Sequence, residues 1–273
     1  MADRILSHER VATSTPDRWL YLLHGIYGAG RNWATVARRI ARERPDWGVV
    51  LVDLRQHGGS QGFPPPHTLV TAAEDLVILA RATGETPAAV LGHSFGGKVA
   101  LSYARRAPED LRQLWIVDSA PEAREPGGSA WDMLGTLNRL PDHFETRAGA
   151  IESLQAEGID RPVAEWMATN LERKGDGYGW RFDLGAIEAL LEDFFGSDLW
   201  PIVERPPDRV EMHFVRATES SILSAAAGKR IEASGGHAHL HEVKGGHWLN
   251  ADNPDALVDL IAGALPSPSD GEG

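Results

Sequence analysis

The residues best suited to chemistry lie in a Gly-x-Ser-x-Gly sequence, Gly92-His-Ser-Phe-Gly96, which follows an apolar run and precedes a helical pattern. In this context the serine is predicted to lie on a strained strand-to-helix turn that exposes its hydroxyl, and close-packed neighbours require glycine at both flanking positions. The chain contains no cysteine, which excludes a thiolate nucleophile and disulfide bonds. Ser94 is therefore the candidate nucleophile for acyl transfer.

A second glycine-containing loop, His24-Gly-Ile-Tyr-Gly28, also leaves an apolar run and leads toward a helical pattern. Acyl transfer needs two backbone N–H donors near the oxyanion that forms on the substrate. We expect the amide of Phe95, directly after the nucleophile, to be one donor and the amide of Ile26 to be the other. The alternatives are a plain connecting turn or a phosphate-binding loop, but the loop does not match the glycine patterns of dinucleotide or nucleoside triphosphate sites.

The candidate general base is His247, which lies in the sequence Gly245-Gly-His-Trp-Leu249 before the last helical pattern. Its place fits the chain order serine, acid, histidine. His24 and His93 lie inside the two glycine-containing motifs, where structural roles are favoured. His247 is therefore the histidine best placed to take a proton from the nucleophile.

Three further histidines, His237, His239 and His241, alternate along the chain. On a strand they would share one face and resemble a metal site, but no nearby carboxylate completes an obvious set of ligands. We therefore favour a solvated strand edge, and we expect neither a metal ion nor an organic cofactor.

Two carboxylates compete for the role of the acid that orients the histidine. Asp118 follows the apolar run 114–117, whereas Glu219 lies in the loop after the run 212–215. Many enzymes with a serine nucleophile and a histidine base place their acid in the second of these regions. The acid must be held by fixed backbone against the histidine nitrogen that faces away from the serine. A strand-end aspartate meets this need better than a loop glutamate, so Asp118 is preferred and Glu219 is the alternative.

These side chains need a scaffold that brings strand ends together. Short apolar runs without strict polar alternation, typical of strands buried on both faces, occur at residues 20–23, 49–54, 88–91, 114–117 and 212–215. Between them apolar residues recur at helical spacing, as in the segment 33–41. The alternation predicts an α/β protein with a mostly parallel sheet that helices cover on both faces.

The alternation breaks over residues 121–207, where helical patterns and glycine-rich turns follow one another without a convincing strand. We expect a helical insertion in a core formed by residues 1–120 and 208–265, with a disordered tail at 266–273. Aromatic residues of the insertion either build its own core or face a pocket above the sheet. On the second interpretation the predicted pocket residues are His24, Gly25, Tyr27, His93, Trp166, Trp180 and Trp248.

The charge balance and the start of the chain limit the expected partners. Lysine and arginine number 27 and aspartate and glutamate 39, so the formal net charge is −12, which disfavours nucleic acids and anionic membranes as partners. The N-terminal segment is polar, without the apolar stretch of a signal peptide, and no run approaches the ~18 apolar residues of a membrane span. We expect a cytoplasmic protein.

These motifs resemble those of the α/β-hydrolase superfamily, and the resemblance covers nearly the whole chain. Within it the chain is most similar to small serine esterases of the YbfF and abhydrolase-domain-11 type, on the segments His24-Gly25, Asp53-Leu-Arg-Gln-His-Gly-Gly-Ser60, Gly92-His-Ser-Phe-Gly-Gly-Lys98, Val117-Asp-Ser-Ala-Pro121, Thr169-Asn-Leu171 and Tyr178-Gly-Trp-Arg-Phe-Asp-Leu184. The resemblance implies the α/β-hydrolase fold, an inserted helical cap or lid, an ester substrate and an acid at Asp118.

The expected activity is hydrolysis of short- to medium-chain carboxylic esters through an acyl-enzyme, with Ser94, His247 and Asp118 as the catalytic triad. A carbon–carbon bond hydrolase, a thioesterase or a perhydrolase would use the same triad. A non-catalytic binding protein of the same fold is disfavoured because Ser94 and His247 are both present. The expected partner is a small-molecule ester.

Overall fold

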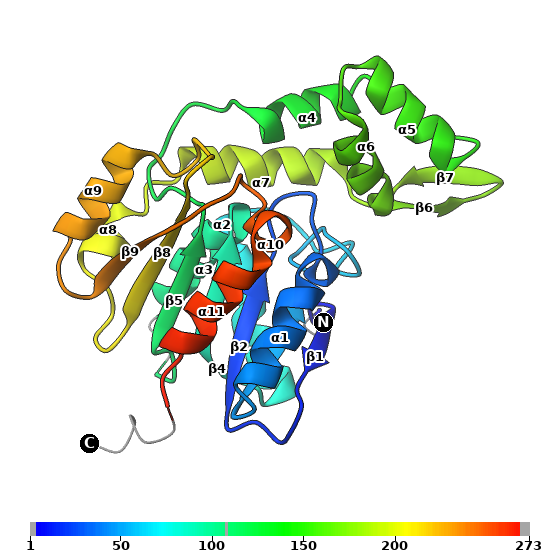
Figure 1. The fold of residues 1–273 in the computed structure, drawn as a ribbon. Helices are drawn as coiled ribbons and strands as arrows, with labels where there is room; N and C mark the ends of the chain where they lie inside the picture. Colours follow the sequence, from blue (N-terminus) through cyan, green and yellow to red (C-terminus); the bar gives the residue numbers. More distant parts are fainter. Residues whose placement is uncertain (1–3, 107–108, 268–273) are drawn as a thin grey trace.

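A seven-stranded sheet runs through the centre of the protein (Figure 1), in a computed structural model that describes residues 4–106 and 109–267. The strand order is β1-β3-β2-β4-β5-β8-β9, and the strands are β1 (His8–Val11), β2 (Arg18–Leu23), β3 (Trp47–Val52), β4 (Pro87–His93), β5 (Gln113–Val117), β8 (Glu211–Ala217) and β9 (Ala238–Val243). β1 is antiparallel to β3, whereas the other described pairs of this sheet are parallel.

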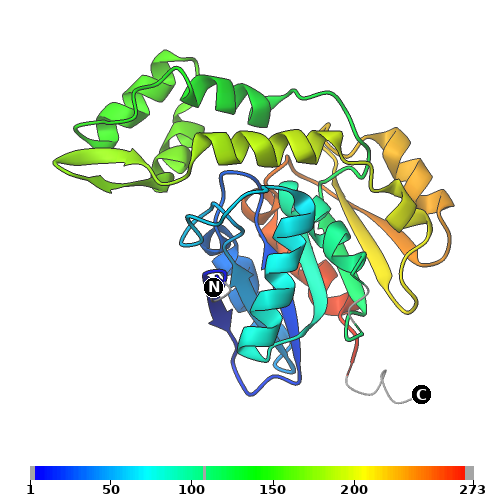
Figure 2. The same cartoon turned by 180° about the vertical axis from the view of Figure 1, so that it is seen from behind.

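Helices cover both faces of the sheet (Figures 1 and 2). One face carries η1 (Gly30–Trp33), α1 (Ala34–Glu43), α10 (Leu249–Asp252) and α11 (Pro254–Ala264). The other carries α2 (Leu69–Thr83), α3 (Phe95–Ala104), α8 (Trp200–Glu204) and α9 (Ala225–Ala233). Because it is covered on both sides, β3 is buried at every residue, which explains why its sequence shows no polar alternation.

The five predicted strands correspond to β2, β3, β4, β5 and β8, so the predicted α/β class with a mostly parallel, helix-covered sheet is confirmed. The prediction omits β1. Its sequence, His-Glu-Arg-Val, contains no buried residue because the strand lies at the edge of the sheet. An edge strand of this kind lacks the apolar run by which the inner strands are recognised.

Most of residues 121–207 form a layer above the ends of the parallel strands (green to yellow in Figure 1). Its helices are α4 (Ser129–Leu137), α5 (Arg147–Ala156), α6 (Arg161–Met167), η2 (Ala168–Asn170) and α7 (Leu184–Gly196). The expectation of an insertion without strands is wrong, because β6 (Leu171–Lys174) and β7 (Gly177–Trp180) form an antiparallel hairpin. Glycine is unfavourable in strands, which is why the sequence does not indicate β7. The packing nevertheless requires glycine at position 177, because a Cβ atom there would lie 2.3 Å from the Phe144 carbonyl oxygen.

A buried lysine of α3 joins the two ends of this insertion to the core. The Lys98 ammonium, 1% exposed, donates hydrogen bonds to the carbonyls of Glu122, Phe194 and Ser197 at 2.8, 2.7 and 2.8 Å. It also lies 4.7 Å from the centre of the Phe194 ring. Burial, and then the charge of Arg124, lower the pKa of Lys98 to about 8. The three carbonyls therefore satisfy a cation that would otherwise be costly to bury.

The prediction of a disordered tail over residues 266–273 is wrong at Pro266. The Pro266 carbonyl accepts hydrogen bonds from Arg18 at 3.2 Å, Arg44 at 2.8 Å and Trp47 at 3.3 Å, which hold it against the end of the sheet. Residues 268–273 lie outside the described part of the chain. Across the described residues no helix combines the length and the apolar character that a membrane crossing requires.

Candidate active site

Ser94 lies on the turn between β4 and α3, with φ +52° and ψ −115°, a conformation that L-residues rarely adopt. A Cβ atom on Gly92 would lie 2.0 Å from the carbonyl oxygen of Gly96, and a Cβ atom on Gly96 would lie 2.6 Å from that of His24. Both positions therefore require glycine. The Ser94 N–H donates to the Val117 carbonyl at 3.0 Å, which ties the turn to β5.

His247 and Asp118 are joined by a hydrogen bond of 2.7 Å between Nδ1 and Oδ2. Asp118 follows β5 with φ +43° and is fully buried. Its N–H donates to the Val215 carbonyl at 2.8 Å, and its Oδ1 accepts the Ala217 N–H at 3.4 Å, so β8 fixes the carboxylate. Because Nδ1 of His247 donates to Asp118, its Nε2 is left to accept a proton.

Glu219, the alternative acid, is exposed in the loop after β8. Its backbone N–H donates to the Gly245 carbonyl at 2.9 Å. The loop after β8 therefore supports, through the main chain, the loop that carries His247. Of the two candidate acids, the structure places Asp118 against the His247 ring.

His93, directly before the candidate nucleophile, supports His247 from a different side. Its Nε2 donates to the His247 carbonyl at 2.7 Å, and the two ring centres lie 4.6 Å apart. Burial, and then the neighbouring His247, lower the pKa of His93 to about 3. The His93 ring is therefore neutral near pH 7, and it fixes the His247 backbone without placing a charge beside it.

The loop after β2 is oriented by His24, which is 1% exposed. Its Nε2 accepts the Leu54 N–H at 3.0 Å, so the proton is on Nδ1, which donates to the Gly25 carbonyl at 2.7 Å. The Gly28 N–H donates to the same carbonyl at 3.0 Å. Since the C=O and N–H of a trans peptide point in opposite directions, the Ile26 N–H is directed away from both of these donors.

This loop lies close to the candidate nucleophile. A Cβ atom on Gly25 would lie 3.4 Å from the Cβ of Ser94. Within the described residues, the N–H groups of Ile26 and Phe95 have no hydrogen-bond partner in the protein. Phe95 is the first residue of α3, where the helix leaves its N–H groups unpaired. Two backbone donors beside Ser94 are thus available to a ligand.

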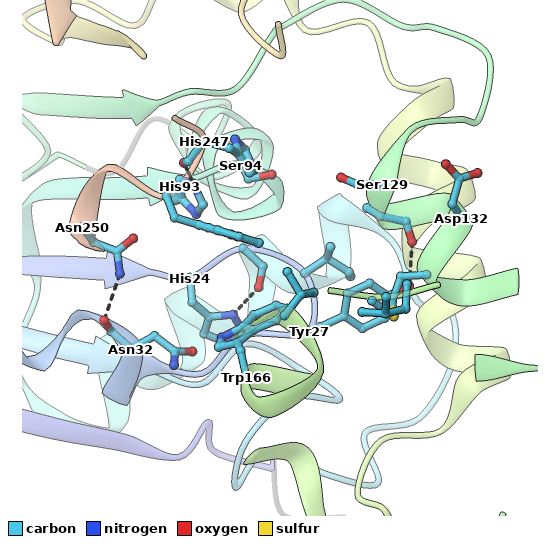
Figure 3. Close-up of a pocket in the computed structure, with 18 of the residues that line it drawn as sticks. His24, Tyr27, Asn32, His93, Ser94, Ser129, Asp132, Trp166, His247 and Asn250 are labelled. Carbon is cyan, nitrogen blue, oxygen red and sulfur yellow. Dashed lines mark hydrogen bonds between the residues drawn. The ribbon is translucent and has the colours of Figure 1, made fainter. Parts of the chain in front are cut away.

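A cavity of about 380 Å³ opens in front of Ser94, between the sheet edge and the insertion. In Figure 3 His93, Ser94 and His247 lie on one side of it, and Ser129 and Asp132 of α4 on the other. Six of the predicted pocket residues line this cavity, namely His24, Gly25, Tyr27, His93, Trp166 and Trp248.

The expectation for Trp180 is corrected, because this residue is not among those that line the cavity. Trp180 is 5% exposed at the end of β7, where it stacks on Phe182 with ring centres 5.8 Å apart and an angle of 4°. It also meets Phe144 edge-on at 5.8 Å. Trp180 therefore belongs to the core of the insertion, the other of the two roles expected for its aromatic residues.

Several cavity residues are absent from the prediction. They include the apolar side chains Trp33, Met133, Ile159 and Val163, and the amides Asn32 and Asn250. Asn250 Nδ2 donates to the Asn32 carbonyl at 3.0 Å, which links α10 to η1. The one usable signal is the three-residue spacing of Val163 and Trp166 on α6, which puts both side chains on one helix face.

A second, smaller cavity of about 200 Å³ meets the same site. It shares Ser94, His247 and Ile26 with the larger cavity and continues along Phe95 toward Phe194 of α7. The two cavities therefore adjoin at Ser94, and one extends under α6 and the other under α7.

Of the alternating histidines, His239 and His241 lie on the edge strand β9, whereas His237 precedes it and hydrogen-bonds the Val203 carbonyl at 2.8 Å. The predicted solvated edge is corrected in part, because His239 and His241 are half-buried. His241 Nε2 is 3.1 Å from Nδ1 of His213, and the His213 ring stacks on Trp115 at 4.2 Å and near His239 at 5.0 Å. Burial, and then His241, lower the pKa of His213 to about 3. In residues 4–106 and 109–267 no group of three or more potential ligands is arranged to hold a metal ion.

Comparison with known proteins agrees with this fold. The family model described as the alpha/beta hydrolase fold matches residues 18–162. The sn-1-specific diacylglycerol lipase ABHD11 of Mus musculus is 25% identical over 252 residues, which cover 90% of this chain and 80% of that protein. Esterase YbfF of Escherichia coli is 25% identical over 244 residues, which cover 89% of this chain and 91% of that protein.

The similarity extends to solved structures. A marine microorganism esterase superposes with a TM-score of 0.83 and 25% identity, covering 96% of this chain and all of the other. The family model spans more than half of the sequence, including the turn that carries Ser94. The chain therefore belongs to the α/β-hydrolase fold family and is a relative of its YbfF- and ABHD11-type esterases and lipases.

Proposed function

We propose that the protein hydrolyses carboxylic esters through an acyl-enzyme on Ser94, with His247 as general base and Asp118 as the acid that orients it. The observation that carries this proposal is the buried Asp118 carboxylate at 2.7 Å from His247 Nδ1, beside a serine in a strained turn. The relatives named esterases and lipases support the same chemistry.

In the first half-reaction the Ser94 hydroxyl oxygen adds to the ester carbonyl carbon while His247 Nε2 takes its proton. The carbonyl oxygen becomes an oxyanion. When it collapses, the bond to the alcohol oxygen breaks, and His247 gives its proton to the departing alcohol. Water then attacks the acyl-serine in the same way, so that the acid is released and the Ser94 hydroxyl is restored.

The N–H groups of Ile26 and Phe95 stabilise the oxyanion in this proposal. Their lack of partners among the described residues and their nearness to Ser94 support the assignment. A donor of this kind is worth about 3 kcal/mol in the transition state. Asp118 contributes by keeping the Nδ1 proton in place and stabilising the imidazolium that forms at His247.

The larger cavity is proposed to hold a short- to medium-chain acyl group. Its volume of about 380 Å³ and apolar lining, with Trp166 and Trp248 5.7 Å apart, support an apolar occupant. Residues 121–207 then act as a cap that supplies one wall of the site. The smaller cavity is left for the alcohol portion of the ester.

The test is hydrolysis of p-nitrophenyl esters of graded length, from acetate to decanoate, by the wild type and by Ser94→Ala. We expect the wild type to be active and Ser94→Ala to lose at least about 10⁴-fold in kcat while unfolding at the same temperature. Retained activity in Ser94→Ala would exclude the proposed nucleophile. Labelling by a fluorophosphonate, which needs an activated serine, separates an enzyme from a binding protein of the same fold.

A further inference from the structure

Tyr27 follows the proposed oxyanion donor Ile26 and has an unusual backbone. Its φ is +61°, in the left-handed region that residues with a side chain rarely adopt, and it is 2% exposed. Such a conformation costs on the order of 1–3 kcal/mol and persists only where surrounding contacts hold it. The loop His24–Gly28, called the oxyanion loop below, therefore depends for its conformation on the contacts of Tyr27.

Several of those contacts come from the insertion rather than from the sheet. The side-chain amide of Asn170 donates to the Tyr27 carbonyl at 2.8 Å. The Tyr27 hydroxyl donates to the Ala130 carbonyl in α4 at 2.8 Å, and its ring lies 5.8 Å from that of Phe182. Of these contacts, the Asn170 bond is the one that acts on the main chain of the loop.

Asn170 is itself held firmly. It is 4% exposed in η2, and its own carbonyl accepts the Arg181 N–H at 3.0 Å. The Arg147 guanidinium donates to the carbonyls of Ala168 and Leu171, on either side of it, at 2.7 Å each. A buried amide is costly unless it is paired, so the bond to Tyr27 accounts for an asparagine at this position.

Two hydrogen bonds and two peptide planes connect Asn170 to the Ile26 amide. The peptide between Tyr27 and Gly28 is held at its C=O by Asn170 and at its N–H by the Gly25 carbonyl. The Gly25 carbonyl belongs to the same rigid peptide as the Ile26 N–H. A rotation of the Tyr27–Gly28 peptide would therefore be passed on to the direction of the Ile26 N–H.

We propose that Asn170 is a positioning residue that holds the oxyanion loop in its active conformation, so that its bond to the Tyr27 carbonyl sets the direction of the Ile26 amide. This inference rests on the proposed function, because it assigns a role within the same site. In this role the Thr169-Asn170-Leu171 motif contributes to activity without contacting the substrate or the triad. The insertion thereby contributes to the chemical step as well as to the shape of the cavity.

The test uses Asn170→Asp, which keeps the shape of the side chain but replaces the donor with a carboxylate oxygen. Arg31→Ala is the matched control, because Arg31 Nη2 donates to the neighbouring Thr169 carbonyl at 2.8 Å and also ties η2 to the core, without contacting Tyr27. Asn170→Ser, which is too short to reach Tyr27 and adds no charge, is the second variant if Asn170→Asp does not fold.

The rate of Ser94 labelling by a fluorophosphonate is measured first, because it needs no known substrate. We expect it to fall about 10- to 100-fold in Asn170→Asp, less than the about 10²–10³-fold of a deleted oxyanion donor, and less than threefold in Arg31→Ala. With an active ester, kcat should fall by a similar factor while KM changes less than threefold. Inhibition by a trifluoromethyl ketone, which forms a tetrahedral oxyanion, should weaken in parallel with kcat/KM.

The possible failures are distinguishable. If the wild type is not labelled, Ser94 is not activated and the proposed function fails. If the wild type is labelled and the Asn170 variants react at the wild-type rate, the positioning role is wrong while the proposed function stands. A lower unfolding temperature with unchanged kcat and unchanged ketone inhibition would likewise reduce Asn170 to a structural residue and overturn the inference.

Discussion

The sheet edge around Ser94 and the insertion above it face each other across one cavity, but they are held in different ways. At the sheet edge the main chain itself sets the geometry, with glycines at 92 and 96 packed against other backbone at distances that exclude a Cβ atom. The insertion reaches the site through side chains such as Asn170 and Trp166. The proposed reacting groups thus depend on close backbone packing that requires glycine at 92 and 96, whereas the proposed walls of the substrate cavity depend on side chains.

The most severe test of this difference is the acid at the sheet edge. Asp118→Asn keeps the shape of the side chain but disturbs the tautomer of His247, so kcat should fall about 10⁴-fold. Glu219→Gln is the matched control, and its kcat should stay within about threefold of the wild type, because Glu219 meets the histidine loop only through its backbone N–H. A large loss in the Glu219 variant alone would reverse the assignment of the acid.

A methyl group added at the sheet edge tests the backbone directly. In Gly96→Ala the new Cβ would lie 2.6 Å from the His24 carbonyl oxygen, so the loop after β2, which carries the proposed oxyanion donor Ile26, must move. We expect kcat to fall about 10²-fold or more and the free energy of unfolding to fall by about 2 kcal/mol. Gly263→Ala, in α11, would bring the new methyl within 4 Å of no atom beyond its chain neighbours and its own helix backbone, and it should be as active as the wild type. Equal behaviour of the two variants would contradict the close packing.

Two tryptophans of the insertion test whether its walls select the substrate. Trp166→Ala enlarges the cavity, so KM should change by up to about tenfold for the longer esters and little for acetate. Trp180→Ala removes a ring from the core of the insertion and should lower the free energy of unfolding by about 3 kcal/mol, with the ranking of esters unchanged. If Trp180→Ala also changes the order in which the esters are preferred, then Trp180 is not purely a core residue and its distinction from Trp166 is wrong.

The last prediction concerns stability alone, through the buried histidines of the core. The pKa values of His57, His93 and His213 are lowered to about 3, chiefly by burial, from 6.5. Between these pH values the unfolded chain binds more protons, so the free energy of unfolding decreases as pH falls from 6.5 toward 3, by at most about 1.4 kcal/mol per pH unit for each group. Urea unfolding of His213→Gln at pH 4.5 and 7 should show a shallower dependence than the wild type. An identical pH dependence would show that His213 does not carry this penalty.

The sheet and the residues at its edge were predictable because local sequence encodes them. A Gly-x-Ser-x-Gly motif between an apolar run and a helix has few ways to fold, and the apolar runs report burial on both faces. The outer strand β1 was not predictable, because its polar residues follow from its place at the edge. The preference for Asp118 as the partner of His247 rested on its place at a strand end, where fixed backbone holds the carboxylate, and on the resemblance to known esterases.

The insertion was harder to predict for a physical reason. Whether an aromatic residue packs inward or faces a cavity depends on contacts between segments distant in sequence. Trp166 and Trp180 illustrate this, because Trp166 lines the cavity whereas Trp180 packs in the core of the insertion. The link from Asn170 to the Tyr27 main chain joins residues 143 positions apart, and no spacing in the sequence indicates it. The resemblance to known esterases marked the Thr169-Asn170-Leu171 segment but gave no physical role for it.

The Lys98 ammonium has a consequence for how this architecture can diversify. By binding Glu122 at the start of the insertion and Ser197 near its end, it keeps both points of departure fixed on α3. For a flexible connection between fixed ends, doubling the length costs only about 0.6 kcal/mol in closure entropy. Segments between these anchors can therefore be lengthened, shortened or replaced at little cost to the core, provided that Tyr27 is still held.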